Sequence, residues 1–133
     1  MLNRNCYEAA LNAFLTGGAQ GIEGARLAHG FPALHKDDLD SPAGSVYGHA
    51  WIEGKINGVE VCLNLTPQIL TNRLTFYMAG KINPDYVTHY TESEAFEKAV
   101  MTENSGPWTD EGDLRHAPGA AFVYLKPDPN GEN

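Results

Sequence analysis

The clearest hydrophobic pattern in the chain is a strict alternation of apolar and polar residues, which reads YGHAWIEGKINGVEVCLNLTP over residues 47–67. Asn57-Gly58 lies between two β-prone runs and is the preferred two-residue turn of a β-hairpin. This turn fixes the pairing of the two strands, and it places Lys55 opposite Glu60 as a favourable cross-strand charge pair. The sequence therefore predicts an antiparallel hairpin with a defined register.

The predicted register sorts the hairpin side chains onto two faces. One face is free of polar side chains and is expected to pack on a core: Ala50, Ile52, Gly54, Ile56, Val59, Val61, Leu63 and Leu65. The other face carries His49, Trp51, Glu53, Lys55, Glu60, Cys62, Asn64 and Thr66. In this register Trp51 lies opposite Asn64, and His49 is the diagonal neighbour of Asn64. Diagonal pairs lie about 7–8 Å apart at Cα, so their side chains can interact.

Helical spacing marks the start of the chain. A helix is predicted from Cys6, with Asn5 as its N-cap and Glu8 in the position of a capping box. The pair Gly17-Gly18 is expected to end it. This prediction places the sulfur of Cys6 at the N-terminal end of a helix.

The remaining elements give weaker patterns. A second helix is expected from about Thr91, where Thr91 and Glu94 form another capping box, with an apolar face made of Ala95, Phe96, Ala99 and Val100. Short strands are expected at residues 24–31, 74–79, 86–90 and 121–125, and an exposed loop at residues 32–44. These elements together predict an α+β domain.

Composition limits the class of protein. The 133 residues, 42% of them hydrophobic, fit one globular domain over residues 1–133, with a frayed end at about 127–133. The 17 acidic residues exceed the 9 basic ones and give a net charge of −8, which argues against nucleic acid or an anionic membrane as a partner. Two cysteines imply no disulfide framework, and neither a transmembrane stretch nor a secretory signal is evident, so a cytoplasmic location is expected.

Three residues form a candidate catalytic set. A helix N-terminus favours the thiolate of Cys6, which would make this sulfur a nucleophile, although an isolated cysteine is more often a small buried residue. His49 is a candidate base, and Asn64 can hold the imidazole ring so that its other nitrogen faces the thiol. Trp51 is expected to shield the bond between His49 and Asn64 from water.

Two other residues of the hairpin are expected to serve the scaffold. Cys62 lies in the middle of a strand, away from any helix N-terminus, and is expected to be structural. Glu53 is expected at the surface or at the rim of a cleft. No group of residues has the spacing of a metal site, and no cofactor is expected.

The order of these motifs resembles the transglutaminase-like core of the papain-type cysteine enzymes. The matching stretches are NCYEAALNAFL, GIEGARLAHGFPA, GHAWIEG and VCLNLTP, which together run from Asn5 to Pro67. The resemblance implies that Cys6 is the nucleophile, His49 the base and Asn64 the third member, where transglutaminase-like proteins usually carry Asp. The chain is also similar to small bacterial and phage proteins with the same layout.

The resemblance implies an N-terminal helix packed on an antiparallel sheet, and a thiol-dependent acyl-transfer enzyme. A peptidase, an amidase or deamidase, and a transamidase all remain open, with a peptide, a protein or a small amide or ester as substrate. The alternative is an inactive transglutaminase-like fold that acts as a binding or inhibitor protein. Asn5, Tyr47 and Gln20 are candidate oxyanion donors, and Trp51, Tyr47 and Asn5 are the expected substrate-binding or shielding residues.

Overall fold

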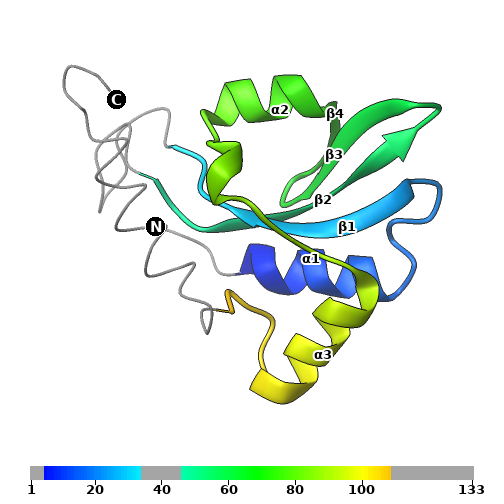
Figure 1. Cartoon of the computed structure of the whole chain (residues 1–133), viewed down its shortest axis with the longest axis vertical. Coiled ribbons are helices and arrows are strands. Elements are labelled where there is room, and N and C mark those ends of the chain that lie inside the picture. The colour runs from blue at the N-terminus through cyan, green and yellow to red at the C-terminus, as the bar shows by residue number, and fades with distance from the viewer. Residues whose placement is uncertain (1–4, 34–45, 109–133) are drawn as a thin grey trace.

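The computed structural model describes residues 5–33 and 46–108, and this part of the chain has an α+β fold (Figure 1). Five strands form one antiparallel sheet in the order β4-β3-β2-β1-β5. Along the chain the elements are α1 (Asn5–Leu15), β1 (Glu23–Gly30), β2 (His49–Ile56), β3 (Val59–Leu65), β4 (Gln68–Asn72), α2 (Arg73–Gly80), η1 (Pro84–Tyr86), β5 (Thr88–Tyr90) and α3 (Glu92–Thr102). Most of the expected loop at 32–44, the strand at 121–125 and the frayed end lie outside the described residues.

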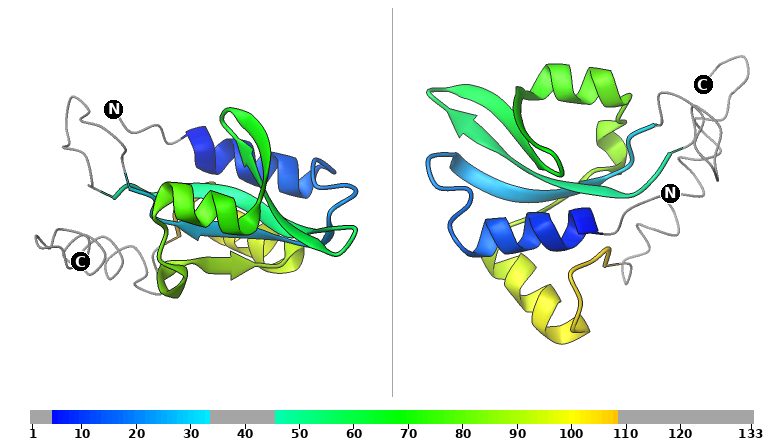
Figure 2. Two further views of the ribbon diagram at one scale, coloured as in Figure 1. Left: turned by 90° about the horizontal axis from the view of Figure 1, so that it is seen from above. Right: turned by 180° about the vertical axis from the view of Figure 1, so that it is seen from behind.

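The sheet is covered on both faces. Helices α1 and α3 lie on one face and α2 lies on the other (Figures 1 and 2). The core between the sheet and helices α1 and α3 contains the buried residues Cys6, Tyr7, Ala10, Leu11, Phe14, Leu27, Ala50, Ile52, Leu63, Tyr90, Ala95 and Trp108. The core between the sheet and α2 contains Ala28, Trp51, Cys62, Tyr77 and Ile82. Alternation along β2 thus sends Ala50 and Ile52 to one layer and Trp51 to the other.

The hairpin of β2 and β3 confirms the register predicted from the sequence. Lys55 pairs with Glu60, and the ladder continues to the pair of Ile52 and Leu63. Both turn residues have positive φ, 52° at Asn57 and 82° at Gly58. Asn and Gly tolerate this conformation, which matches the right-handed twist of the flanking strands.

The two predicted helices are present, with differences at their edges. Helix α1 begins at Asn5, so that residue is the first of the helix and Cys6 is the second. Helix α3 confirms the capping box, in which the Thr91 side chain and Glu94 each accept from the other's backbone N–H. The predicted apolar face of α3 is only partly correct, because Phe96 and Val100 are more than half exposed, at 59% and 57%.

The segment at 74–79 was predicted as a strand and is helical. The reason lies just before it, where the Asn72 side chain accepts a hydrogen bond from the backbone N–H of Thr75 and so caps α2. Packing of Tyr77 on the sheet then outweighs the strand preference of its aromatic neighbours. Strand β4 was not predicted, and the strand expected at 86–90 is confined to β5 because η1 occupies its beginning.

The hairpin turn gives a test of the fold. A Cβ at Gly58 would meet no atom within 4 Å, so Gly58→Ala adds only the strain of positive φ. We expect the free energy of unfolding in urea to fall by about 1–2 kcal/mol. The control Asn57→Gly, at the other positive φ, should change it by less than about 0.5 kcal/mol. An unchanged stability in Gly58→Ala would contradict the assigned turn.

Candidate active site

His49 and Asn64 form the centre of the site. His49 is the first residue of β2 and Asn64 is near the end of β3, as the diagonal pairing predicts. Nε2 of His49 lies 2.6 Å from Oδ1 of Asn64. An amide oxygen only accepts hydrogen bonds, so Nε2 carries the proton and Nδ1 keeps its lone pair. The imidazole is thus held in the tautomer that leaves Nδ1 able to accept a proton.

Two aromatic rings flank this imidazole. Trp51 is fully buried and stacks near the His49 ring, with the ring centroids 6.0 Å apart and an interplanar angle of 29°. Tyr47 meets the same ring edge-on at 5.9 Å. The Trp51 ring therefore lies beside the His49 ring, and its shielding of the bond between His49 and Asn64 stays a prediction.

Burial sets the protonation of His49. Removal from water lowers the pKa of His49 below its ordinary value of 6.5, and the hydrogen bond to Asn64 acts in the opposite direction but is weaker. The imidazole is therefore neutral at pH 7 and can act as a base.

Cys6 lies at the other side of the sheet from His49, at the same end. Cys6 is buried in the layer of α1, whereas His49 shares a cavity with residues of α2. The start of α1 and the start of β2 lie at the same end of the sheet in Figures 1 and 2. The first turn of α1 contacts the residue before β2 directly, because a Cβ at Gly48 would overlap the hydroxyl oxygen of Tyr7. A side chain at position 48 would therefore require the Tyr7 ring to shift, a constraint that the sequence alone did not reveal.

Tyr47 connects the two halves of the site. Burial raises the pKa of Tyr47 above 10, and the charge of a Cys6 thiolate raises it further. Tyr47 is thus within electrostatic reach of Cys6 while its ring contacts His49. Its hydroxyl stays protonated at neutral pH and can donate a hydrogen bond.

The other two candidate oxyanion donors fare differently. Asn5 is the first residue of α1, next to Cys6. Gln20 is exposed in the turn after α1, at the end of this helix opposite to Cys6, so the prediction for Gln20 is wrong. The helix has 11 residues, which separates its ends by about 16 Å.

Cys62 differs from Cys6 in its surroundings. It is fully buried in the middle of β3, under α2. Burial raises the pKa of the Cys62 thiol strongly, and the nearby carboxylate of Glu53 raises it further. Cys62 therefore stays a neutral thiol, as a structural residue should.

Glu53 corrects the expectation of a surface carboxylate, because only 2% of the residue is exposed. Its carboxylate accepts hydrogen bonds from Nε1 of Trp51 at 2.8 Å and from the hydroxyl of Tyr77. Nε2 of His89 lies 2.9 Å from Oε1, and Nε of Arg73 lies 3.4 Å from the same oxygen. These five residues are called the Glu53 cluster below. The sequence did not reveal it, since three of the partners lie 20 to 36 residues away.

The cluster keeps Glu53 charged. Burial alone would raise the pKa of Glu53, but the hydrogen bonds of His89, Tyr77 and Trp51 together outweigh it and lower the pKa from 4.5 to about 2. A buried carboxylate with this many donors is a structural anchor at neutral pH.

A buried histidine lies close to the site. His29 is 6% exposed and packs against the rings of Tyr7 and Trp108, with centroids 5.0 and 5.1 Å away. Burial, and then the charge of His49, lowers the pKa of His29 to about 3. Its ring nitrogens have no hydrogen-bond partner among the described residues. His29 is therefore neutral and is a packing residue at pH 7.

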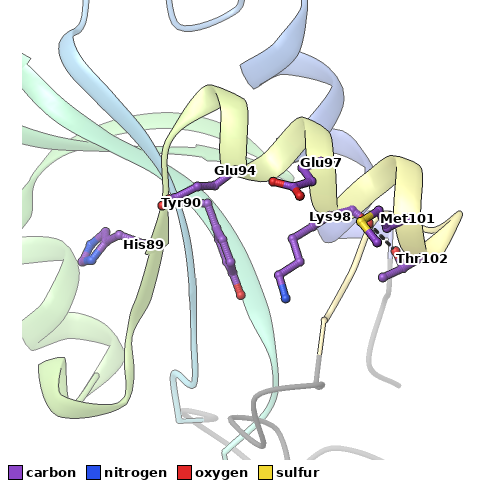
Figure 3. A pocket seen from close by; sticks show the side chains of 7 residues that line it. All are labelled: His89, Tyr90, Glu94, Glu97, Lys98, Met101 and Thr102. Atoms are coloured by element: carbon purple, nitrogen blue, oxygen red, sulfur yellow. Dashed lines mark hydrogen bonds between the residues drawn. The ribbon is translucent and has the colours of Figure 1, made fainter.

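Two cavities bear on function. A cavity of about 180 Å³ adjoins both His49 and Asn64. Another, of about 530 Å³, lies between β5 and α3 (Figure 3). Tyr90 and Lys98 point into the same space there, whereas His89 points away from it toward Glu53. None of the predicted site residues is among the described residues that line this larger cavity.

Within residues 5–33 and 46–108, no three His, Cys, Asp or Glu side chains are grouped as a metal ion requires. None of the helices in this part of the chain has the length and apolar character needed to cross a membrane. Comparisons with protein-family models, with curated proteins and with solved structures find no match.

The Glu53 cluster predicts a pH-dependent stability. The pKa of Glu53 is lower in the folded state, so its contribution is complete above about pH 4.5 and is lost as the pH falls toward 2. Glu53→Gln should reduce the free energy of unfolding at pH 7 by about 3 kcal/mol and should flatten its decline below pH 5. Urea unfolding at several pH values measures both effects.

Glu60→Gln is the matched control for this prediction. The Glu60 side chain is 54% exposed, and its Oε1 lies 3.6 Å from Nη1 of Arg73. Its loss should cost less than about 1 kcal/mol. Equal effects of the two substitutions would contradict the role of Glu53 as a buried anchor.

Proposed function

We propose that the protein is a thiol-dependent acyl-transfer enzyme in which Cys6 is the nucleophile, His49 the base and Asn64 the residue that orients His49. The observation that carries the proposal is the 2.6 Å hydrogen bond between His49 and Asn64. It selects the tautomer in which Nδ1 can accept the proton of a thiol. The resemblance of the motifs to transglutaminase-like enzymes supports the same assignment.

The proposed reaction has two stages. His49 takes the proton of Cys6, and the sulfur attacks the carbonyl carbon of an amide or ester. A C–S bond forms, the bond to the amine or alcohol breaks, and this leaving group takes the proton from His49. Water or an amine then gives a proton to His49 and attacks the thioester carbon. The C–S bond breaks and the sulfur of Cys6 takes the proton back from His49, which gives hydrolysis or transamidation respectively.

The neighbourhood of Cys6 fits the role of a nucleophile. Cys6 is in the first turn of α1, where the helix dipole stabilises a negative charge. The first turn contacts Gly48, the residue before His49, through the Tyr7 hydroxyl. The proposal requires that the thiol meet Nδ1 of His49 around the start of β2.

Selective alkylation tests the proposal. We expect iodoacetamide to label Cys6 at pH 7 about tenfold or more faster in the wild type than in His49→Ala, because His49 accepts the thiol proton. Peptide mapping reads each site separately. Cys62, which is also buried but lies in the middle of a strand, is the internal control. Slow labelling of Cys6 that is independent of His49 would overturn catalysis and favour the alternative of a binding protein.

The pH profile of the iodoacetamide labelling tests whether His49 acts as a base and whether Asn64 influences its pKa. The pKa of His49 is below 6.5, so the rate should fall on the acid side with a midpoint below that value. The hydrogen bond that His49 donates to Asn64 raises the pKa of His49, so Asn64→Ala should move the midpoint to lower pH. A midpoint that stays in place in Asn64→Ala would refute the role of Asn64.

Tyr47 is the proposed side-chain donor to the oxyanion, together with the backbone N–H of Cys6. Tyr47→Phe should slow the acylation of Cys6 by an activated ester about 100-fold while iodoacetamide labelling stays unchanged. Tyr86→Phe, a half-buried tyrosine of η1, is the matched control. Equal acylation rates in Tyr47→Phe and the wild type would exclude this donor.

A further inference from the structure

The cavity beside His49 and Asn64 has a definite chemical character. The lining residues with polar side-chain groups are His49 and Asn64, which are bonded to each other, and Tyr47 with its hydroxyl. The rest of the described lining is apolar and includes Pro32, Phe76 and Ile82. No Asp, Glu, Lys or Arg is among the described residues that line it. A charged group placed there would lose its hydration without gaining a counter-charge.

The size of the cavity limits what it can hold. Its volume is about 180 Å³. One water molecule has a share of about 30 Å³ in the liquid, so this space holds roughly six water-sized groups. Sites for drug-sized ligands are larger, at about 300–1,000 Å³. The cavity therefore suits one short side chain or acyl chain.

We infer that this cavity receives the acyl part of the substrate, and that this acyl group is short and uncharged, with about six non-hydrogen atoms at most. The inference rests on the proposed function, which requires the thiol of Cys6 to meet His49. An acyl group carried by Cys6 would then extend into the space that adjoins the imidazole. It narrows the substrate from amides and esters in general to those with a small neutral acyl chain.

Helix α2 supplies the residues that set the size limit. Phe76 forms a wall and is held by packing on Trp51, with the ring centroids 5.1 Å apart. Ala79 is exposed and lines the cavity, so a larger side chain there would fill space without disturbing a core. Gly80 is close to its neighbours, since an added Cβ would lie 3.1 Å from Ile82. Phe76 and Ala79 are therefore the specificity-determining residues.

The test uses p-nitrophenyl esters of four acids: acetic, butyric, octanoic and succinic acid as its monoester. Attack by the sulfur of Cys6 forms a thioester and releases p-nitrophenolate, which absorbance measures, and intact mass with peptide mapping locates the acyl group. We expect acetyl and butyryl transfer to Cys6 to be at least about tenfold faster than octanoyl or succinyl transfer.

Two variants change the size limit in opposite directions. Phe76→Ala should bring octanoyl transfer within about threefold of butyryl transfer, because it lengthens the cavity. Ala79→Leu should slow butyryl transfer about tenfold more than acetyl transfer. Met78→Leu, at a position on the same helix that is 67% exposed, is the control and should keep the wild-type order. Thermal unfolding checks each variant, and the exposed position of Ala79 keeps the test valid if Phe76→Ala does not fold.

The outcomes separate this inference from the proposed function. Faster octanoyl or succinyl transfer, or an order of rates that neither Phe76→Ala nor Ala79→Leu changes, would overturn the inference and leave the function standing. Labelling of Cys6 that depends on His49, without acylation by any of the esters, would also overturn it. Labelling of Cys6 that is independent of His49 would overturn both the proposed function and this inference.

Discussion

The buried charge of Glu53 is the constraint on which the packing under α2 depends. A carboxylate that is only 2% exposed requires compensation, because its hydration is lost. The donors come from three different elements: Trp51 from β2 itself, Arg73 and Tyr77 from α2, and His89 from β5. One charge thus ties a helix and an edge strand to the central strand of the sheet.

The same cluster supports the candidate active site, because its member Trp51 is two residues from His49 along β2. Alternation along β2 puts His49, Trp51 and Glu53 on one face, so a side chain held at one position limits its neighbours. Glu53 accepts the indole N–H of Trp51, and the Trp51 ring stacks on the imidazole of His49. The stability of the scaffold and the orientation of the proposed base therefore share one set of contacts. Phe76 packs on the Trp51 ring and also lines the cavity beside His49 and Asn64, so the same contacts extend to the wall of this cavity.

Local signals were sufficient to predict the hairpin and α3. Asn57-Gly58 specifies its turn through positive φ, and the alternation on both sides then determines which side chains share a face. The pairing of His49 with Asn64 follows from that register alone. Contacts distant in sequence were not predictable in this way. Residues 74–79 carry strand-prone aromatics, but the cap at Asn72 and the packing of Tyr77 decide for a helix.

The two halves of the candidate site differ in how the sequence determines them. His49 and Asn64 belong to one hairpin, so their geometry is local and survives wherever the hairpin forms. The position of Cys6 depends on how α1 packs, and the Tyr7 side chain of α1 packs closely against Gly48, just before β2. Cys6 and His49 occupy opposite layers at one end of the sheet. The proposed reaction requires the thiol from one layer to meet the base from the other layer at this end of the sheet.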